Sequence, residues 1–139
     1  MYVSEGETIE HRVTLSAADV SAFAHLSGDR NPIHHDEAFA AATRFGGIIA
    51  SGPQTAGIFM GIVATHFSQR NAMLGLEFAF RFLGPARAGE ELSMEWRVVS
   101  VEPKPSLHGD IAKLTGSVRN AAGVEIVSGT GTVLVVERL

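Results

Sequence analysis

The chain of 139 residues contains no cysteine. Disulfide frameworks, thiolate zinc sites and cysteine nucleophiles are therefore excluded. Residues 1–7 also lack a basic stretch followed by an apolar run, so we expect no secretory signal and a cytoplasmic location. A chain of this length can bury a core without disulfides or a metal to hold it folded, and we expect a single domain over residues 1–139.

Long apolar runs and an excess of positive charge are missing as well. The most apolar segment, residues 57–63, is flanked by the polar residues Gln54 and His66 and falls short of the ~20 residues that a membrane span needs. The 11 Lys and Arg are outnumbered by 15 Asp and Glu, giving a formal net charge of −4, and they form no basic stripe. We therefore expect neither a membrane nor a nucleic-acid partner, although a few local cations can still bind an anionic small molecule.

Helix signals dominate the first half of the chain. Residues 10–15 alternate between polar and apolar as in a short strand, and residues 16–19 (SAAD) then form a capping box that begins a helix. Gly28 is suited to end this helix, since glycine readily adopts the left-handed conformation that follows a helix C-terminus. Asp36 is the predicted N-cap of a second helix over residues 37–44, and the glycine pair at 46–47 is expected to end it.

A third, apolar helix is predicted over residues 53–67. Pro53 suits its first position, where the missing N–H costs nothing. Small residues occur all round this segment: Ala56, Gly57, Gly61 and Ala64. We expect them to let strands approach closely from several sides, so that a sheet wraps around the helix.

From Leu74 onward the hydrophobic period becomes two, as in strands. The side chains of Leu76, Phe78, Phe80 and Phe82 are predicted to point one way. Further strands are expected over residues 92–101, 111–119 and 124–136, with a hairpin turn at 120–123. The order of elements predicts an α+β chain with the hot-dog fold, in which an antiparallel sheet of about five strands curls around a central helix.

The loop from Gly28 to His35 holds the residues best suited to acid/base chemistry. Asp29 and His34 lie on either side of Pro32, and the residue before a proline is pushed away from helical geometry. The carboxylate and the imidazole can therefore converge on one small volume and hold a water between them. Asn31 is expected to orient the loop through side-chain hydrogen bonds to nearby backbone and to transfer no proton itself.

This loop and its flanks resemble a known family. Residues 24–34 (AHLSGDRNPIH), followed by Asp36 and residues 38–40 (AFA), are similar to the motif of the MaoC-like, or R-specific, enoyl-CoA hydratases. The resemblance extends from residues 6–7 to residues 85–90. It implies hydration of a trans-2-enoyl thioester to an R-3-hydroxyacyl thioester, or the reverse, without metal or redox cofactor. It assigns Asp29 and His34 as the catalytic pair and implies an acyl-CoA or acyl-carrier-protein substrate and a homodimer.

Such chemistry also needs a hydrogen-bond donor for the thioester oxygen. The N-terminus of the third predicted helix offers free N–H groups, and Gly52 is the candidate donor. Pro53 removes one backbone donor, and the Gln54 amide or the Ser51 hydroxyl could add to Gly52. The family commonly has His-Gly-Met where this chain has Ser-Gly-Pro.

Other interpretations remain open beside hydration. A hot-dog thioesterase would also use a carboxylate and a water, and a non-catalytic acyl-binding subunit would need no chemistry. We expect no metal site at His34, His35 and Asp36, because adjacent side chains seldom reach one ion. The other histidines receive no role. Five cations are candidates for CoA phosphates, and the sequence does not choose among them: Arg44, Arg70, Arg81, Arg87 and Lys104.

Overall fold

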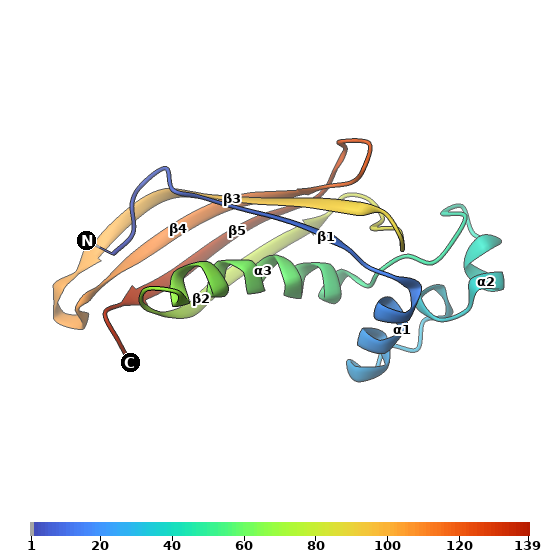
Figure 1. The fold of residues 1–139 in the computed structure, drawn as a ribbon, viewed down its shortest axis with the longest axis horizontal. Coiled ribbons are helices and arrows are strands. Elements are labelled where there is room, and N and C mark those ends of the chain that lie inside the picture. The colour runs from blue at the N-terminus through green and yellow to red at the C-terminus, as the bar shows by residue number, and fades with distance from the viewer. Residues whose placement is uncertain (1) are drawn as a thin grey trace.

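The structure, a computed structural model, describes residues 2–139. A five-stranded antiparallel sheet curves over one long helix, and two short helices lie beyond one end of that helix (Figure 1). In chain order the elements are β1 (Thr8–Thr14), α1 (Ala17–Leu26), a short 3-10 helix (Pro32–His34), α2 (Glu37–Ala41), α3 (Gly52–Ser68), β2 (Ala72–Phe82), β3 (Glu91–Lys104), a second 3-10 helix (Pro105–Leu107), β4 (Gly109–Arg119) and β5 (Glu125–Val136).

The strand order is β1-β3-β4-β5-β2, and every neighbouring pair is antiparallel. The predicted antiparallel sheet of five strands, curved over a central helix, is confirmed. Both β1 and β2 are edge strands. None of the helices in the described part of the chain is long and apolar enough to cross a membrane.

The helix caps follow the sequence signals closely. Ser16 Oγ accepts a hydrogen bond from the Asp19 N–H, and the Asp19 carboxylate accepts one from the Ser16 N–H, both at 3.0 Å. Gly28 follows α1 with a φ of 76°, the left-handed conformation in which glycine carries no steric penalty. α3 begins one residue earlier than predicted, so that Ser51 is the N-cap and Pro53 is the second helical residue. The proline is still free of cost there, because the first four N–H groups of a helix have no partner within it.

α2 is shorter than the predicted helix over residues 37–44. It ends at Ala41 because the Thr43 hydroxyl donates to the Ala40 carbonyl at 2.7 Å, which offers the backbone an alternative to helical bonding. A turn to Gly46, whose φ is 71°, then leads the chain toward α3.

The core is built around Trp96 of β3. Its indole stacks on the Phe59 ring of α3, with centroids 4.1 Å apart, and its Nε1–H donates to the Phe59 carbonyl at 2.8 Å. Sheet glycines make this approach possible. A Cβ on Gly116 would lie 2.6 Å from both the Glu95 carbonyl oxygen and the Trp96 ring, and one on Gly129 would lie 3.0 Å from Trp96.

The expected role of the small residues of α3 is therefore wrong in part. Gly57, Gly61 and Ala64 are exposed, and a Cβ on either glycine would meet nothing within 4 Å. Only Ala56 of the four is buried. Close packing between helix and sheet depends instead on the glycines of β4 and β5, because the sheet covers one side of α3 and does not surround it.

The predicted alternation of β2 is interrupted at Leu76. Phe78 and Phe80 pack against the core, whereas Leu76 and Phe82 are 53% and 55% exposed. A bulge between Gly75 and Glu77 interrupts the strand's register with β5. Because β2 has no partner along its outer edge, alternation alone does not bury its apolar side chains.

Candidate functional site

The loop between α1 and α2 is held by bonds to its own backbone. The Asp29 N–H donates to the Ala24 carbonyl at 2.8 Å, and one oxygen of the Asp29 side chain, Oδ1, accepts from the Asn31 N–H at 2.9 Å. The Asn31 side chain in turn accepts from the Ile33 N–H at 3.3 Å, at the start of the 3-10 helix. These turns leave the second oxygen of Asp29, Oδ2, free to face His34.

Asp29 and His34 come together as the sequence predicts. Nε2 of the buried His34 ring lies 3.3 Å from Oδ2 of the half-buried Asp29 side chain. Nδ1 of the same ring lies 2.7 Å from the Ile49 carbonyl oxygen. A carbonyl only accepts, so Nδ1 carries the hydrogen, and the lone pair of the neutral ring sits on Nε2. Two acceptors then face each other, an arrangement that a water can bridge by donating to both.

A cavity of about 700 Å³ opens in front of His34. Asn31 and His34 line it from the loop, Gly52 and Pro53 from the start of α3, and Phe82 and Leu83 from the end of β2. Asp29 lies on an adjoining hollow of about 480 Å³ with His25 and His35. Asp29 and His34 therefore line two different hollows, with the imidazole on the larger one.

The N-terminus of α3 presents one of the three groups considered as donors. Gly52 lines the cavity, and no acceptor within residues 2–139 takes up its N–H. The Ser51 hydroxyl instead caps the helix by accepting from the Gln54 N–H at 3.3 Å. The Gln54 side chain turns to α1, where its amide donates to the Asp19 carbonyl at 3.2 Å and leaves Oε1 buried without a partner. Of the three residues, Gly52 is thus the one that lines the cavity and whose N–H has no acceptor among residues 2–139.

The structure distinguishes among the five cations considered for CoA phosphates. Arg44 alone among them lines the cavity, and its guanidinium lies 4.9 Å from the centre of the Phe45 ring. It takes part in none of the ion pairs among residues 2–139. Arg70 pairs with Glu7 and Lys104 with Glu102, both far along the chain from the loop. Within the described part of the chain, Arg44 is the only permanently charged side chain on the cavity wall.

Sequence reasoning missed the contacts of His35. Its Nδ1 lies 2.8 Å from the Ser21 hydroxyl, and its Nε2 lies 2.8 Å from the carbonyl oxygen of Asp29. Fourteen residues separate Ser21 from His35, and no spacing rule connects a helix residue to a loop at that distance. Within the described residues, no three His, Cys, Asp or Glu side chains gather as ligands for a metal ion.

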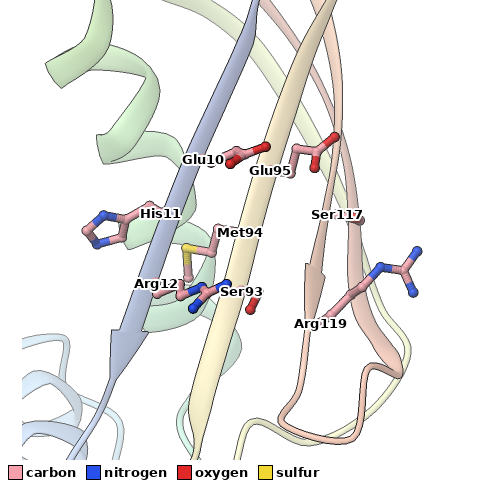
Figure 2. Close-up of a pocket in the computed structure, with 8 residues that line it drawn as sticks. All are labelled: Glu10, His11, Arg12, Ser93, Met94, Glu95, Ser117 and Arg119. Atoms are coloured by element: carbon pink, nitrogen blue, oxygen red, sulfur yellow. The ribbon is translucent and has the colours of Figure 1, made fainter.

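Another hollow, of about 560 Å³, lies over β1, β3 and β4 (Figure 2). It carries charges of both signs, with Glu10 directly across from Glu95 and Arg119 nearby. None of the site residues predicted from the sequence lines it. We interpret it as a solvent-exposed face of the sheet.

The chain is similar to known proteins over most of its length. Residues 3–119 match the family model of the MaoC like domain. The (R)-specific enoyl-CoA hydratase of Aeromonas caviae is 36% identical over 119 residues, which cover 84% of each chain. The 3-hydroxybutyryl-CoA dehydratase of Methylorubrum extorquens is 37% identical over 90 residues, or 65% of this chain and 57% of that protein.

Solved structures agree with the sequence comparison. The R-hydratase PhaJ1 of Pseudomonas aeruginosa superposes with a TM-score of 0.86 at 29% identity, covering 97% of this chain and 83% of that one. The (R)-hydratase of A. caviae gives 0.85 at 30% identity, covering 94% and 96%. The hot-dog fold expected from the sequence is thereby confirmed, and the chain belongs to the MaoC-like domain family.

Proposed function

We propose that this protein adds water to trans-2-enoyl thioesters to give R-3-hydroxyacyl thioesters, and catalyses the reverse dehydration. One observation carries the proposal: Nε2 of His34, unprotonated in the neutral ring, faces Oδ2 of Asp29 at 3.3 Å beside a cavity of acyl-chain size. The named relatives support the reaction class, because one is an (R)-specific enoyl-CoA hydratase and another is a 3-hydroxybutyryl-CoA dehydratase.

The proposed reaction is a balanced addition. A water held between Asp29 and His34 gives one proton to the pair as its oxygen bonds to C3 of the enoyl group. The electrons of the double bond move toward the thioester, whose oxygen gains negative charge. C2 then takes a proton from the pair, which returns to its starting state. The reaction transfers no net electrons, so it needs no redox cofactor, and in this proposal Asp29 and His34 make the proton transfers without a metal.

The Gly52 N–H is the proposed donor for the charged thioester oxygen. It stands at the first position of a 17-residue helix, where the helix dipole also favours negative charge. Phe82 approaches this residue so closely that a Cβ on Gly52 would lie 3.1 Å from its ring. A larger residue at this position would push against Phe82, which lines the cavity, whereas glycine avoids that contact.

We further propose that two copies pair along β2, with an acyl-CoA or acyl-carrier-protein thioester as the substrate of each. The open edge of β2 exposes Leu74 and Leu76, whereas the opposite edge strand carries Glu10 and Arg12 at exposed positions. Charged edges resist pairing and apolar edges favour it. Because Phe82 lies at the end of β2 and also lines the cavity, such a dimer would place its partner next to the site.

The ultraviolet absorbance of crotonyl-CoA, followed together with free thiol, tests the reaction class. Loss of the conjugated double bond without thiol release supports hydration. Thiol release from crotonyl-CoA or from a saturated acyl-CoA would instead identify a thioesterase. Tight binding of acyl-CoA without turnover of any enoyl or acyl thioester would identify a binding subunit and overturn the proposal.

A further inference from the structure

His35 follows His34 in the chain, but its ring turns toward α1. Both of its nitrogens are engaged at 2.8 Å, Nδ1 with the Ser21 hydroxyl and Nε2 with the Asp29 carbonyl oxygen. The carbonyl only accepts, so Nε2 carries the hydrogen. In the neutral ring Nδ1 then accepts from Ser21, whose hydroxyl can rotate to donate. The bond pattern therefore fixes both the tautomer and the orientation of the ring.

The two neighbouring imidazoles are thus set in opposite tautomers. His34 carries its hydrogen on Nδ1, toward the Ile49 carbonyl, and leaves Nε2 open to Asp29. His35 carries its hydrogen on Nε2 and has no nitrogen left for a substrate. His34 is therefore arranged for proton transfer, and His35 is arranged to hold another group in place.

The group that His35 holds is the backbone of Asp29. This residue follows Gly28, whose left-handed φ of 76° directs the chain out of α1. Its N–H is bonded to Ala24, and its carbonyl is bonded to His35 at 2.8 Å. Both anchors lead back to α1, because Ala24 and Ser21 lie on that helix. Without the His35 bond, the peptide after Asp29 would be tied only by the loop's own turns.

We propose that Ser21 and His35 act together as positioning residues, a hydroxyl and an imidazole that fix the Asp29 carboxylate in register with His34. This inference rests on the proposed function, because it assigns the pair a part in the same reaction. The pair acts through Asp29 and touches no substrate.

Substitution of His35 by leucine tests the proposal, since leucine keeps apolar volume and removes both bonds. We expect kcat for crotonyl-CoA hydration to fall about tenfold, the size of one lost hydrogen bond, with KM changed less than about twofold. Ser21→Ala is expected to lower kcat by a smaller factor, and His35→Gln, whose amide can both donate and accept, to recover most of the rate. Ser21→Thr, which keeps the hydroxyl, is expected to retain wild-type kcat.

The matched control is His25→Leu. The His25 ring packs 4.4 Å from that of His35, yet it makes no side-chain hydrogen bond within the described residues. This variant is expected to keep kcat within about twofold. A similar loss in both variants would assign the effect to packing and overturn the proposal. Circular dichroism and the thermal midpoint establish that each variant is folded.

A double-mutant cycle separates positioning from a general loss of structure. Because Ser21 acts only through His35, Ser21→Ala should not lower kcat further in the His35→Leu background. Independent, multiplicative losses would overturn the pairing. So would a His35→Leu enzyme with wild-type kcat.

A second readout needs no turnover, so its failure is distinct from that of the proposed function. Nitrogen-15 spectra of the histidine rings should show hydrogen on Nε2 of His35 and on Nδ1 of His34 at a pH where both rings are neutral. The carboxyl carbon-13 signal of Asp29 should move in His35→Leu and stay in His25→Leu. An Nδ1-protonated His35 or an unmoved Asp29 signal would overturn the inference even in a protein that hydrates no enoyl thioester.

Discussion

The Ile49 carbonyl oxygen lies 2.7 Å from Nδ1 of His34 and thereby decides which ring nitrogen can act as a base. The remaining nitrogen points at Asp29 across 3.3 Å. The site therefore contains two proton acceptors, the half-buried Asp29 carboxylate and the buried His34 imidazole, and Gly52 at the start of α3 lines the same cavity as the imidazole. Protonation of either acceptor makes it a donor, which is what an enzyme that both removes and returns a proton requires.

Loss of either member of the pair should remove most of the activity. Asp29→Asn and His34→Ala are each expected to lower kcat by about 10²- to 10⁴-fold, the usual contribution of a general acid or base. Steady-state rates with crotonyl-CoA measure this. Asp36→Asn is the matched control, since that side chain caps α2 by accepting from the Phe39 N–H and asparagine caps as well. Near wild-type rates in the Asp29 or His34 variant would remove that residue from the mechanism.

Gly52→Ala should disturb the site through its neighbour. The new Cβ would lie 3.1 Å from the Phe82 ring, which must shift along the cavity wall. We expect kcat/KM to fall about five- to tenfold, as for roughly 1 kcal/mol of crowding. Phe82→Leu in the same chain should recover part of the loss. Gly57→Ala serves as the control, because nothing lies within 4 Å of its Cβ position and alanine favours a helix; an equal loss there would contradict the explanation.

Arg44 is expected to bind an anionic group of the substrate. Arg44→Gln should raise KM for crotonyl-CoA about tenfold, the effect of one charge-assisted contact. KM for the crotonyl thioester of pantetheine, which has no phosphate, should stay unchanged if the contact is to a CoA phosphate. Arg30→Gln provides a comparison on a different hollow. Equal KM values for wild type and Arg44→Gln with the CoA thioester would exclude the contact.

The acid stability of the fold should depend on Glu7. Partial burial acts to raise the pKa of Glu7, but hydrogen bonds from His66 and Arg70 outweigh it, and the net pKa is lowered. A lowered folded-state pKa stabilises the protein above the ordinary glutamate pKa of the unfolded chain, and this stability is lost as the pH falls through the folded value. Glu7→Gln should therefore lower the free energy of unfolding by about 1–2 kcal/mol at pH 7 and flatten its dependence on pH below about 5.

Urea unfolding at a series of pH values measures the effect. The exposed Glu5→Gln variant controls for the change in net charge. If Glu7→Gln kept the acid dependence of the wild type, the hydrogen bonds of Glu7 with His66 and Arg70 would not link the N-terminal segment to the end of α3 as the structure indicates.

The parts of this structure that the sequence predicts best are those set by short-range bonds. The capping box at Ser16, the left-handed Gly28 and the cap at Asp36 each depend on residues no more than a few positions apart. The Asp29 and His34 loop belongs to the same class, because Pro32 restricts it locally. The sheet followed from the period-two alternation of its strands.

What the sequence did not predict depends on distant partners. The exposed Leu76 and Phe82 are apolar residues on an edge strand, and edge position is a property of the whole sheet. The glycines that admit Trp96 lie on β4 and β5, although α3 carries more obvious small residues. The hydrogen bond between Ser21 and His35 joins a helix to a loop, and no local sequence pattern indicates it.

The most direct measurement is the fate of labelled water. Crotonyl-CoA is incubated with the purified protein in water enriched in oxygen-18, and the products are analysed by mass spectrometry and chiral separation. We predict R-3-hydroxybutyryl-CoA with the label on C3 and the thioester intact. Label in a free carboxylate, together with released CoA, would contradict it and identify hydrolysis of the thioester instead.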